Sequence, residues 1–248
     1  MDSAYKFSVC PHDTAKNLFG WFLLNTYLQR KTGCALHFEP CHTFVEERGN
    51  VFSDEYHLVY TNPYSALIFN AELGFIPIAK PIGIFDETVM IARRDADLPT
   101  GRIKLATATD MLIVYDLGLA LLEQQNIPRG RCDFTFIGTH LKTVQVIADG
   151  LFDLGFVFSE TWHGLTESTR QQLRVVAESS SQLAYHCFCV APAWLDRREL
   201  LQEILCGMPN DEPGKAILED LRIPGFDALP MNALDSLRVL VDKLAQAK

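Results

Sequence analysis

Short apolar runs alternate with longer amphipathic stretches along most of the chain. Residues 5–10 form an apolar run that predicts a strand. Residues 14–31 repeat apolar side chains at helical spacing and end at Gly33, which is typical of a helix C-terminus. Alternation of this kind predicts an α/β protein with mostly parallel sheets, in which ligands bind at the carboxyl ends of the strands.

The alternation runs through two successive sets of strands and helices. A loop rich in Pro, Gly and Asp at residues 95–101 separates the sets. Because 248 residues suffice for two lobes of roughly 100 residues each, two lobes are expected. The expected strands are 5–10, 35–39, 57–60, 76–81, 87–93, 102–106, 133–137, 153–158, 172–177 and 185–191, and the expected helices are 14–31, 63–72, 109–125, 140–149, 160–168 and most of the last 55 or so residues.

Charge and composition exclude several classes of protein. The net charge is −9 and the basic residues are scattered, which argues against a nucleic-acid binder. No apolar run approaches the roughly 18 residues of a membrane span. The seven cysteines form no regular framework, which favours a reducing compartment. The opening residues Met1–Ala4 show no secretory leader, so we expect either a cytoplasmic protein or one whose leader was removed.

Motifs of the common enzyme classes are missing from the sequence. There is no nucleophile elbow, no phosphate-binding loop, no dinucleotide fingerprint and no zinc-protease motif, so neither catalysis nor a cofactor is expected. The acidic pairs Glu46–Glu47 and Asp54–Glu55 are expected to be solvated charges on a helix or loop.

Two matched junctions between a strand and a helix carry the candidate chemistry. One contains Tyr60, Asn62 and Tyr64, and the other spans residues 106–110. The first N–H groups of a helix are free to hold an anionic or polar group. Thr109 or Asp110 can equally serve as the N-cap of the second helix, and both roles can hold at once.

Several stretches, taken in order, resemble the substrate-binding components of phosphate and phosphonate ABC importers, which have the type 2 periplasmic-binding fold. The resemblance covers roughly residues 5–195. It rests on residues 10–12, 38–42, 59–66, 87–95, 136–140 and 147–157, and the last two stretches are the most specific. Residues 107–111 depart from the family's hydroxyl-rich run at this helix start.

The resemblance implies an α/β fold of two lobes with mixed, mostly parallel sheets and a hinge of two crossing strands. Lobe 1 is then expected at residues 1–91 plus 190–248 and lobe 2 at 92–189, with a ligand cleft between them that closes by hinge motion. The implied ligand contacts are Tyr60, Asn62, Tyr64, Thr107, Thr109, Asp110 and His140, with His12, His42, Glu160 and Tyr185 as looser matches.

The resemblance also places several histidines at loops or strand ends that face this cleft, with cysteines beside them. Cysteine and histidine near one cavity can bind a borderline metal, although Cys-x-His and Cys-His match no standard zinc pattern. The alternatives to a metal site are hydrogen-bonded histidines and buried thiols. Cys187 and Cys189 are expected to share one face of a strand as buried thiols. The candidate metal ligands are Cys10, His12, Cys41, His42 and His186.

The main hypothesis is a solute-binding protein that captures a small polar, anionic or zwitterionic ligand. Backbone N–H groups near Thr109 and after Asn62 are expected to hold its acidic part, His140 and Tyr60 to donate hydrogen bonds, and Asp110 and Glu160 to receive any cationic end. The partner is then an ABC permease. The alternatives are a cytoplasmic sensory module that signals to a partner, and a biosynthetic enzyme on the same fold.

Overall fold

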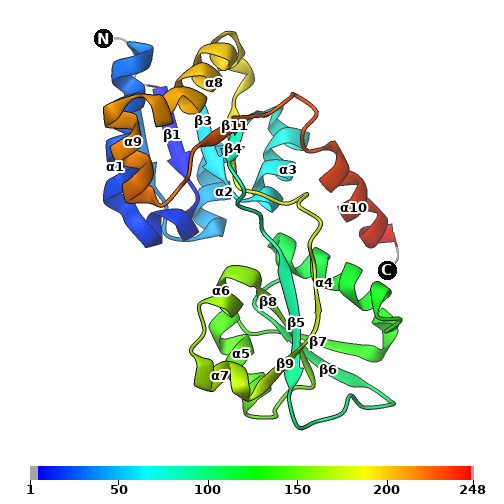
Figure 1. Cartoon of the computed structure of the whole chain (residues 1–248). Helices are drawn as coiled ribbons and strands as arrows, with labels where there is room; N and C mark the ends of the chain where they lie inside the picture. Colours follow the sequence, from blue (N-terminus) through cyan, green and yellow to red (C-terminus); the bar gives the residue numbers. More distant parts are fainter. Residues whose placement is uncertain (1–4, 247–248) are drawn as a thin grey trace. The chain divides into compact units, whose positions relative to one another are not determined.

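The computed structural model describes residues 5–246, and Figure 1 shows the whole chain. The chain forms two compact units. The first contains the described residues up to Ile84 together with Tyr185–Ser236, and the second contains Phe85–Ala184 and the residues from Leu237 onward. The outer lobe boundaries expected at residues 1 and 248, and the opening residues Met1–Ala4, lie outside the described residues.

The first unit is built on a six-stranded mixed sheet, as expected for this fold. The strand order is β11-β4-β10-β3-β1-β2. Strand β1 pairs in parallel with β2 and β3, whereas β10 runs antiparallel to both β3 and β4. The strands are β1 (Tyr5–Val9), β2 (Leu36–Pro40), β3 (Leu58–Thr61), β4 (Ile76–Pro81), β10 (Cys187–Val190) and β11 (Phe226–Ala228).

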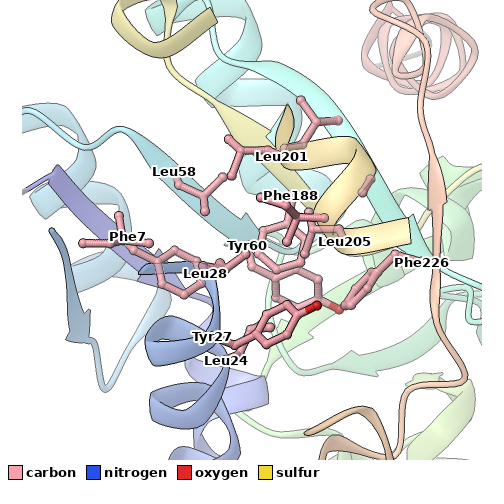
Figure 2. Packing of buried hydrophobic residues seen from close by; sticks show 14 of the residues in the cluster. Phe7, Leu24, Tyr27, Leu28, Leu58, Tyr60, Phe188, Leu201, Leu205 and Phe226 are labelled. Atoms are coloured by element: carbon pink, nitrogen blue, oxygen red, sulfur yellow. The ribbon is translucent and has the colours of Figure 1, made fainter. Parts of the chain in front are cut away.

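The larger core of the first unit lies between this sheet and helices α1, α8 and α9 (Figure 1). Phe188 stands at its centre, 4.8 Å from the ring of Tyr60 and 5.3 Å from that of Phe226. Figure 2 shows Tyr60 and Phe188 among leucines of the surrounding helices. The helices of this unit are α1 (Pro11–Thr32), α2 (Phe44–Ser53), α3 (Pro63–Leu73), α8 (Arg198–Gly207) and α9 (Glu212–Leu221), with short 3-10 turns at Pro192–Arg197 and Met208–Asn210.

The opposite face of the same sheet carries buried polar side chains. Thr61 and Cys187 are fully buried on neighbouring strands, and Ser8 is fully buried on β1. The Sγ atoms of Cys187 and Cys189 lie 3.5 Å apart, so the expectation that the two free thiols share a buried face is confirmed.

The second unit has a five-stranded mixed sheet in the order β7-β6-β8-β5-β9. Strands β6, β7 and β8 are parallel, and β5 runs antiparallel to β8 and β9. Helix α5 packs on β8 and β5, and α4 also packs on β5 and β8 (Figure 1). The elements are β5 (Thr88–Arg93), β6 (Ile103–Thr107), β7 (Cys132–Phe136), β8 (Leu154–Phe158), β9 (Leu173–Glu178), α4 (Ile113–Gln124), α5 (His140–Ala148), α6 (Ser159–His163) and α7 (Glu167–Gln171), with a 3-10 turn at Arg129–Arg131.

The chain passes between the units at different residues from those expected. Strand β5 lies wholly in the second sheet and β10 wholly in the first, whereas the expected lobe boundaries fall inside both strands. Each strand pairs only with strands of its own sheet, so neither strand is divided between the two units. The last helix, α10 (Asp235–Gln246), also differs from expectation, because its Leu244 is buried in the core of the second unit.

Other elements also differ from the sequence prediction. The region of the acidic pairs, expected as a helix or a loop, contains helix α2, strand β11 was not expected, and residues 160–168 form parts of two short helices, α6 and α7, in place of one. Gly164 and Thr166 separate these two helices, and Thr166 Oγ1 caps α7 by accepting a hydrogen bond from Thr169 N. A polar N-cap inside a predicted helix explains the break.

Gly118 on α4 lets the helix pack directly against β8. A Cβ atom at this position would lie 2.3 Å from the ring of the fully buried Phe156. Alanine is usually about 1 kcal/mol better than glycine inside a helix. We nevertheless expect Gly118→Ala to lower the free energy of unfolding by about 1–3 kcal/mol, because overpacking dominates.

Gly49→Ala on α2 is the matched control for this substitution, because nothing lies within 4 Å of the added methyl group. This control should stabilise the protein by about 0.5–1 kcal/mol in urea unfolding. Equal effects of the two substitutions would contradict the close contact between α4 and β8.

Candidate functional site

In the first unit, the ends of several strands bring chemically active side chains to one edge of the sheet. Strands β1, β2 and β3 are parallel, so Cys10, Cys41 and Asn62 follow them at the same edge. Because β10 is antiparallel to β3, His186 comes to this edge just before β10 begins. Helices α1 and α3 also begin here, directly after Cys10 and Asn62.

A largely buried Asp–His pair lies at this edge. His186 Nδ1 lies 2.7 Å from Asp13 Oδ2, and the two side chains are only 11% and 17% exposed. Burial alone would raise the pKa of the Asp13 carboxyl, but the His186 imidazole holds that pKa below its ordinary value. Cys10 is fully buried beside the pair, and burial raises the pKa of its thiol to about 12.

A second layer of buried polar groups comes from α2. Glu47 is fully buried, and its Oε1 accepts a hydrogen bond of 2.7 Å from Thr61 Oγ1. Its Oε2 has no hydrogen-bond partner among residues 5–246. Burial raises the pKa of this carboxyl to about 7, although Thr61 and Arg48 act in the opposite direction. The expectation that Glu47 is a solvated charge is therefore wrong.

Arg48 links α2 to the start of α3. Its Nε donates a hydrogen bond of 2.9 Å to Ser65 Oγ, and its guanidinium lies 4.9 Å from the centre of the Tyr64 ring. Asn62 caps α3, because its Oδ1 accepts a hydrogen bond of 3.0 Å from Ser65 N. Arg48, Asn62 and Ser65 therefore form a buried network under the helix start.

The predicted contacts Tyr60, Asn62 and Tyr185 all lie in the first unit and have partners within the fold, although Tyr185 was expected in lobe 2. Tyr60 is 2% exposed and packs 4.6 Å from the Trp21 ring. The Tyr185 hydroxyl donates a hydrogen bond of 3.0 Å to the Ala233 carbonyl. These side chains are structural in this conformation, and their contact with a ligand stays a prediction.

The predicted metal candidates divide into two groups. Cys10 and His186 come together with Asp13, which was not predicted, and the His12 ring lies 6.3 Å from the His186 ring. Cys41 is separate from this group and accepts a weak hydrogen bond of 3.6 Å from Asn50. His42 is exposed, and its backbone N–H donates to Glu46 Oε2.

In the second unit, the predicted residues follow the parallel strands β6, β7 and β8. Thr107 ends β6, His140 follows β7, and Glu160 follows β8, so all three lie toward the carboxyl edge of the sheet. Backbone hydrogen bonds join two of the loops, from Ile137 N to the Thr107 carbonyl and from Gly138 N to the Ala108 carbonyl. This edge therefore gathers the second set of predicted ligand contacts.

Helix α4 begins four residues later than expected. Its first residue is Ile113, and its N-cap, Leu112, makes no side-chain cap. Asp110 is exposed and precedes the helix, and Thr109 Oγ1 accepts from Met111 N in the preceding turn. Neither Thr109 nor Asp110 is therefore the N-cap, and the first N–H groups of α4 have no cap from either side chain.

The other groups at this edge differ in exposure. Thr107 is fully buried, and its Oγ1 has no hydrogen-bond partner within the described part of the chain. His140 is the first residue of α5 and is half-buried near the Phe158 ring. Thr139 caps α5 by accepting from Lys142 N. Glu160 is exposed in the first turn of α6.

A cavity of about 430 Å³ lies elsewhere in the second unit. It is lined by the last turns of α4, by residues 126–129 and by Leu244. This is the C-terminal end of α4, whereas Thr107 and Thr109 precede its N-terminus. The cavity and the predicted contacts are thus separate features.

Sequence reasoning missed the acidic residues of the first unit. The region of α2 was left open as a helix or a loop, although Phe44, Glu47, Arg48 and Val51 follow helical spacing, and the last three are buried. The available signal for buried charges was that helical spacing places Glu47 and Arg48 on the same face as the apolar Phe44 and Val51. Asp13 lies three residues after Cys10, one helical turn away, and this spacing was the signal for its place beside the thiol.

Comparison with known proteins identifies the family. The family model for the ABC transporter, phosphonate, periplasmic substrate-binding protein matches residues 7–232. The chain belongs to this family. The substrate-binding resemblance drawn from the sequence is thereby confirmed. No curated protein matches the chain in sequence.

Solved structures support the fold of this substrate-binding family member. A Xanthomonas citri protein bound to chloride ion aligns with a TM-score of 0.79 and 15% identity over 99% of both chains. The Prochlorococcus marinus protein PhnD1, in complex with methylphosphonate, aligns with a TM-score of 0.76 and 13% identity over 98% of both chains. The Escherichia coli aliphatic sulphonate binding protein SsuA aligns with a TM-score of 0.69 and 12% identity over 99% of this chain and 93% of that one.

Membership in this family implies a small-molecule ligand and an ABC permease as partner. It gives no support to the alternative of a cytoplasmic signalling module. The helices of residues 5–246 include none that is long and apolar enough to cross a membrane.

Proposed function

We propose that this family member captures a small oxyanion of the phosphonate class for an ABC importer and catalyses no reaction. The observation that carries the proposal is the family match over residues 7–232. The methylphosphonate and sulphonate ligands named for two structural relatives are small and carry a tetrahedral acidic group. We place the ligand of this chain in the same chemical class.

The second unit offers suitable donors for such an acidic group. The first N–H groups of α4 lack a side-chain cap, and the helix dipole favours an anion there. The buried Thr107 hydroxyl and the half-buried His140 imidazole lie on the same edge of the sheet. Asp110 precedes the helix and does not cap it, so it leaves these N–H groups available.

The proposal is tested by a thermal-shift screen. The compounds are phosphate, phosphite, methylphosphonate, an aminoalkylphosphonate and an alkanesulfonate. A specific ligand present at 100 times its Kd should stabilise the protein by about 2.7 kcal/mol. Stabilisation by at least one phosphonate or phosphite is expected, and a flat response to every compound would overturn the proposal.

The role of His140 is tested by substitution. We expect His140→Ala to abolish most of the ligand-induced shift, because the variant loses a hydrogen-bond donor to the oxyanion. His37→Ala is the matched control, because His37 is 62% exposed and lies in the first unit. An unchanged shift in His140→Ala would exclude a ligand contact at that residue.

A further inference from the structure

The Cys10–Asp13–His186 cluster has the donor set of a transition-metal site. One ligand atom from each side chain, a sulfur, an oxygen and a nitrogen, lies within 4.8 Å of the other two. Within the described part of the chain, no other group of three Cys, His, Asp or Glu side chains is gathered in this way. All three residues belong to the first unit; Cys10 is fully buried, and the side chains of His186 and Asp13 are 11% and 17% exposed.

We propose that Cys10, Asp13 and His186 bind a zinc ion, with a water molecule as the fourth ligand. Zinc takes cysteine sulfur, histidine nitrogen and carboxylate oxygen in tetrahedral sites, and three protein ligands leave one position open. A sulfur donor disfavours magnesium and calcium, which prefer oxygen ligands. This inference goes beyond the capture of a phosphonate-class ligand and does not depend on it.

The geometry needs only small side-chain movements to accept the ion. Tetrahedral bonds of about 2.0–2.3 Å separate the donors by roughly 3.3–3.8 Å. No two donors lie more than 4.8 Å apart, so a shift of about 1 Å closes the widest separation, and the 2.7 Å pair of Asp13 Oδ2 and His186 Nδ1 opens by about 0.6 Å. The backbone is held in place, because Cys10 N donates a hydrogen bond of 2.7 Å to the Tyr60 carbonyl and Asp13 N donates one of 3.0 Å to the Cys10 carbonyl.

Charged groups of both signs lie near the cluster, because His12 and Lys16 act on Asp13 and Glu47 acts on Cys10. The N-terminus of α1 repels positive charge. Asp13 opposes that effect, and Glu47, which lies close enough to change the pKa of Cys10, strengthens this opposition once its carboxyl ionises near pH 7. Glu47 Oε2 is buried and has no hydrogen-bond partner among the described residues. A buried polar atom of this kind usually pairs with a water or an ion, so it is independent support for a bound species in this region. On coordination, the thiol proton of Cys10 leaves to solvent as the metal–sulfur bond forms.

The test is a titration of chelator-treated protein with Co²⁺, a spectroscopic substitute for zinc, in the absence of phosphonate. We expect one equivalent to produce the visible bands of tetrahedral cobalt and a thiolate-to-cobalt charge-transfer band, and we expect Zn²⁺ to remove both. Cys10→Ser should lose the charge-transfer band. Asp13→Asn should weaken Co²⁺ binding at least tenfold.

Two thiol variants serve as matched controls. Cys41→Ser removes another buried thiol at the same edge, and Cys206→Ser removes a half-buried thiol elsewhere in the first unit, so both should keep the band. If Cys10→Ser does not fold, His186→Gln takes its place and should weaken Co²⁺ binding at least tenfold, as Asp13→Asn should. Absence of the charge-transfer band in the wild type, or its persistence in Cys10→Ser, would overturn the zinc site, and either result would leave the phosphonate screen unaffected.

Discussion

Phe188→Ala is expected to lower the free energy of unfolding of the first unit by about 3–5 kcal/mol. Phe188 is fully buried, and its ring packs against those of Trp21, Tyr60 and Phe226. Removal of the ring leaves a cavity at the point where β10 crosses the core. Urea unfolding, followed by tryptophan fluorescence, measures the effect; the buried Trp21 and Trp194 report on this unit, and Trp162 reports on the second.

Phe19→Ala is the control for the loss of an aromatic ring. Phe19 is 68% exposed on α1, so its removal should change the free energy of unfolding by no more than about 0.5 kcal/mol. A loss below 1 kcal/mol for Phe188→Ala would contradict the packing that places His186 and β10 beside α1.

Glu47 is expected to make the protein less stable as the pH rises from about 4.5 to about 7. Burial raises the pKa of this carboxyl to about 7 from an ordinary value of 4.5. Within that window the folded state holds a proton that the unfolded state has released. Stability from the neutral carboxyl is therefore present below pH 4.5 and lost above pH 7, a change of about 3 kcal/mol.

Glu47→Gln should remove this pH dependence, because the amide stays neutral. Between pH 4.5 and pH 8, the free energy of unfolding of the wild type should fall by about 3 kcal/mol more than that of Glu47→Gln. The charged groups that face Glu47 are Arg48 and His186, which favour the carboxylate, and Asp13, which disfavours it. The measurement is made with a chelator present, so that metal binding does not contribute.

Glu55→Gln is the control for the removal of one carboxylate, because Glu55 is exposed two residues after the end of α2. It should keep the pH dependence of the wild type. Parallel pH profiles for the wild type and Glu47→Gln would show that the Glu47 carboxyl titrates as it does in water.

The periodic pattern predicted most of the fold because each element buries a regular apolar stripe. The helix at 63–72 was predicted within one residue, because Pro63 begins it and Gly74 ends it. Helix α2 was left undecided between helix and loop because its buried face carries Glu47 and Arg48 in place of apolar residues. Strand β11 has only three residues, two of them exposed, and is too short for a periodic signal.

The predicted site depended on tertiary information that a single sequence does not contain. The family resemblance correctly indicated a substrate-binding protein. It could not show that α4 begins at Ile113, because no polar residue caps this helix and the local signals at Thr109 and Asp110 favoured an earlier start. Cys10 and His186 lie 176 positions apart in sequence, and only the antiparallel pairing of β10 with β3 brings His186 to the edge that Cys10 occupies.

Binding of a phosphonate-class oxyanion is the central claim, and isothermal titration calorimetry of the wild-type protein tests it most directly. Methylphosphonate, phosphite, phosphate and an alkanesulfonate are titrated separately into protein freed of bound ligand. The account predicts saturable binding of one molecule per chain for a phosphonate or phosphite, with the heat largely lost in His140→Ala and retained in His37→Ala. The absence of binding heat with all four compounds in the wild type would contradict it.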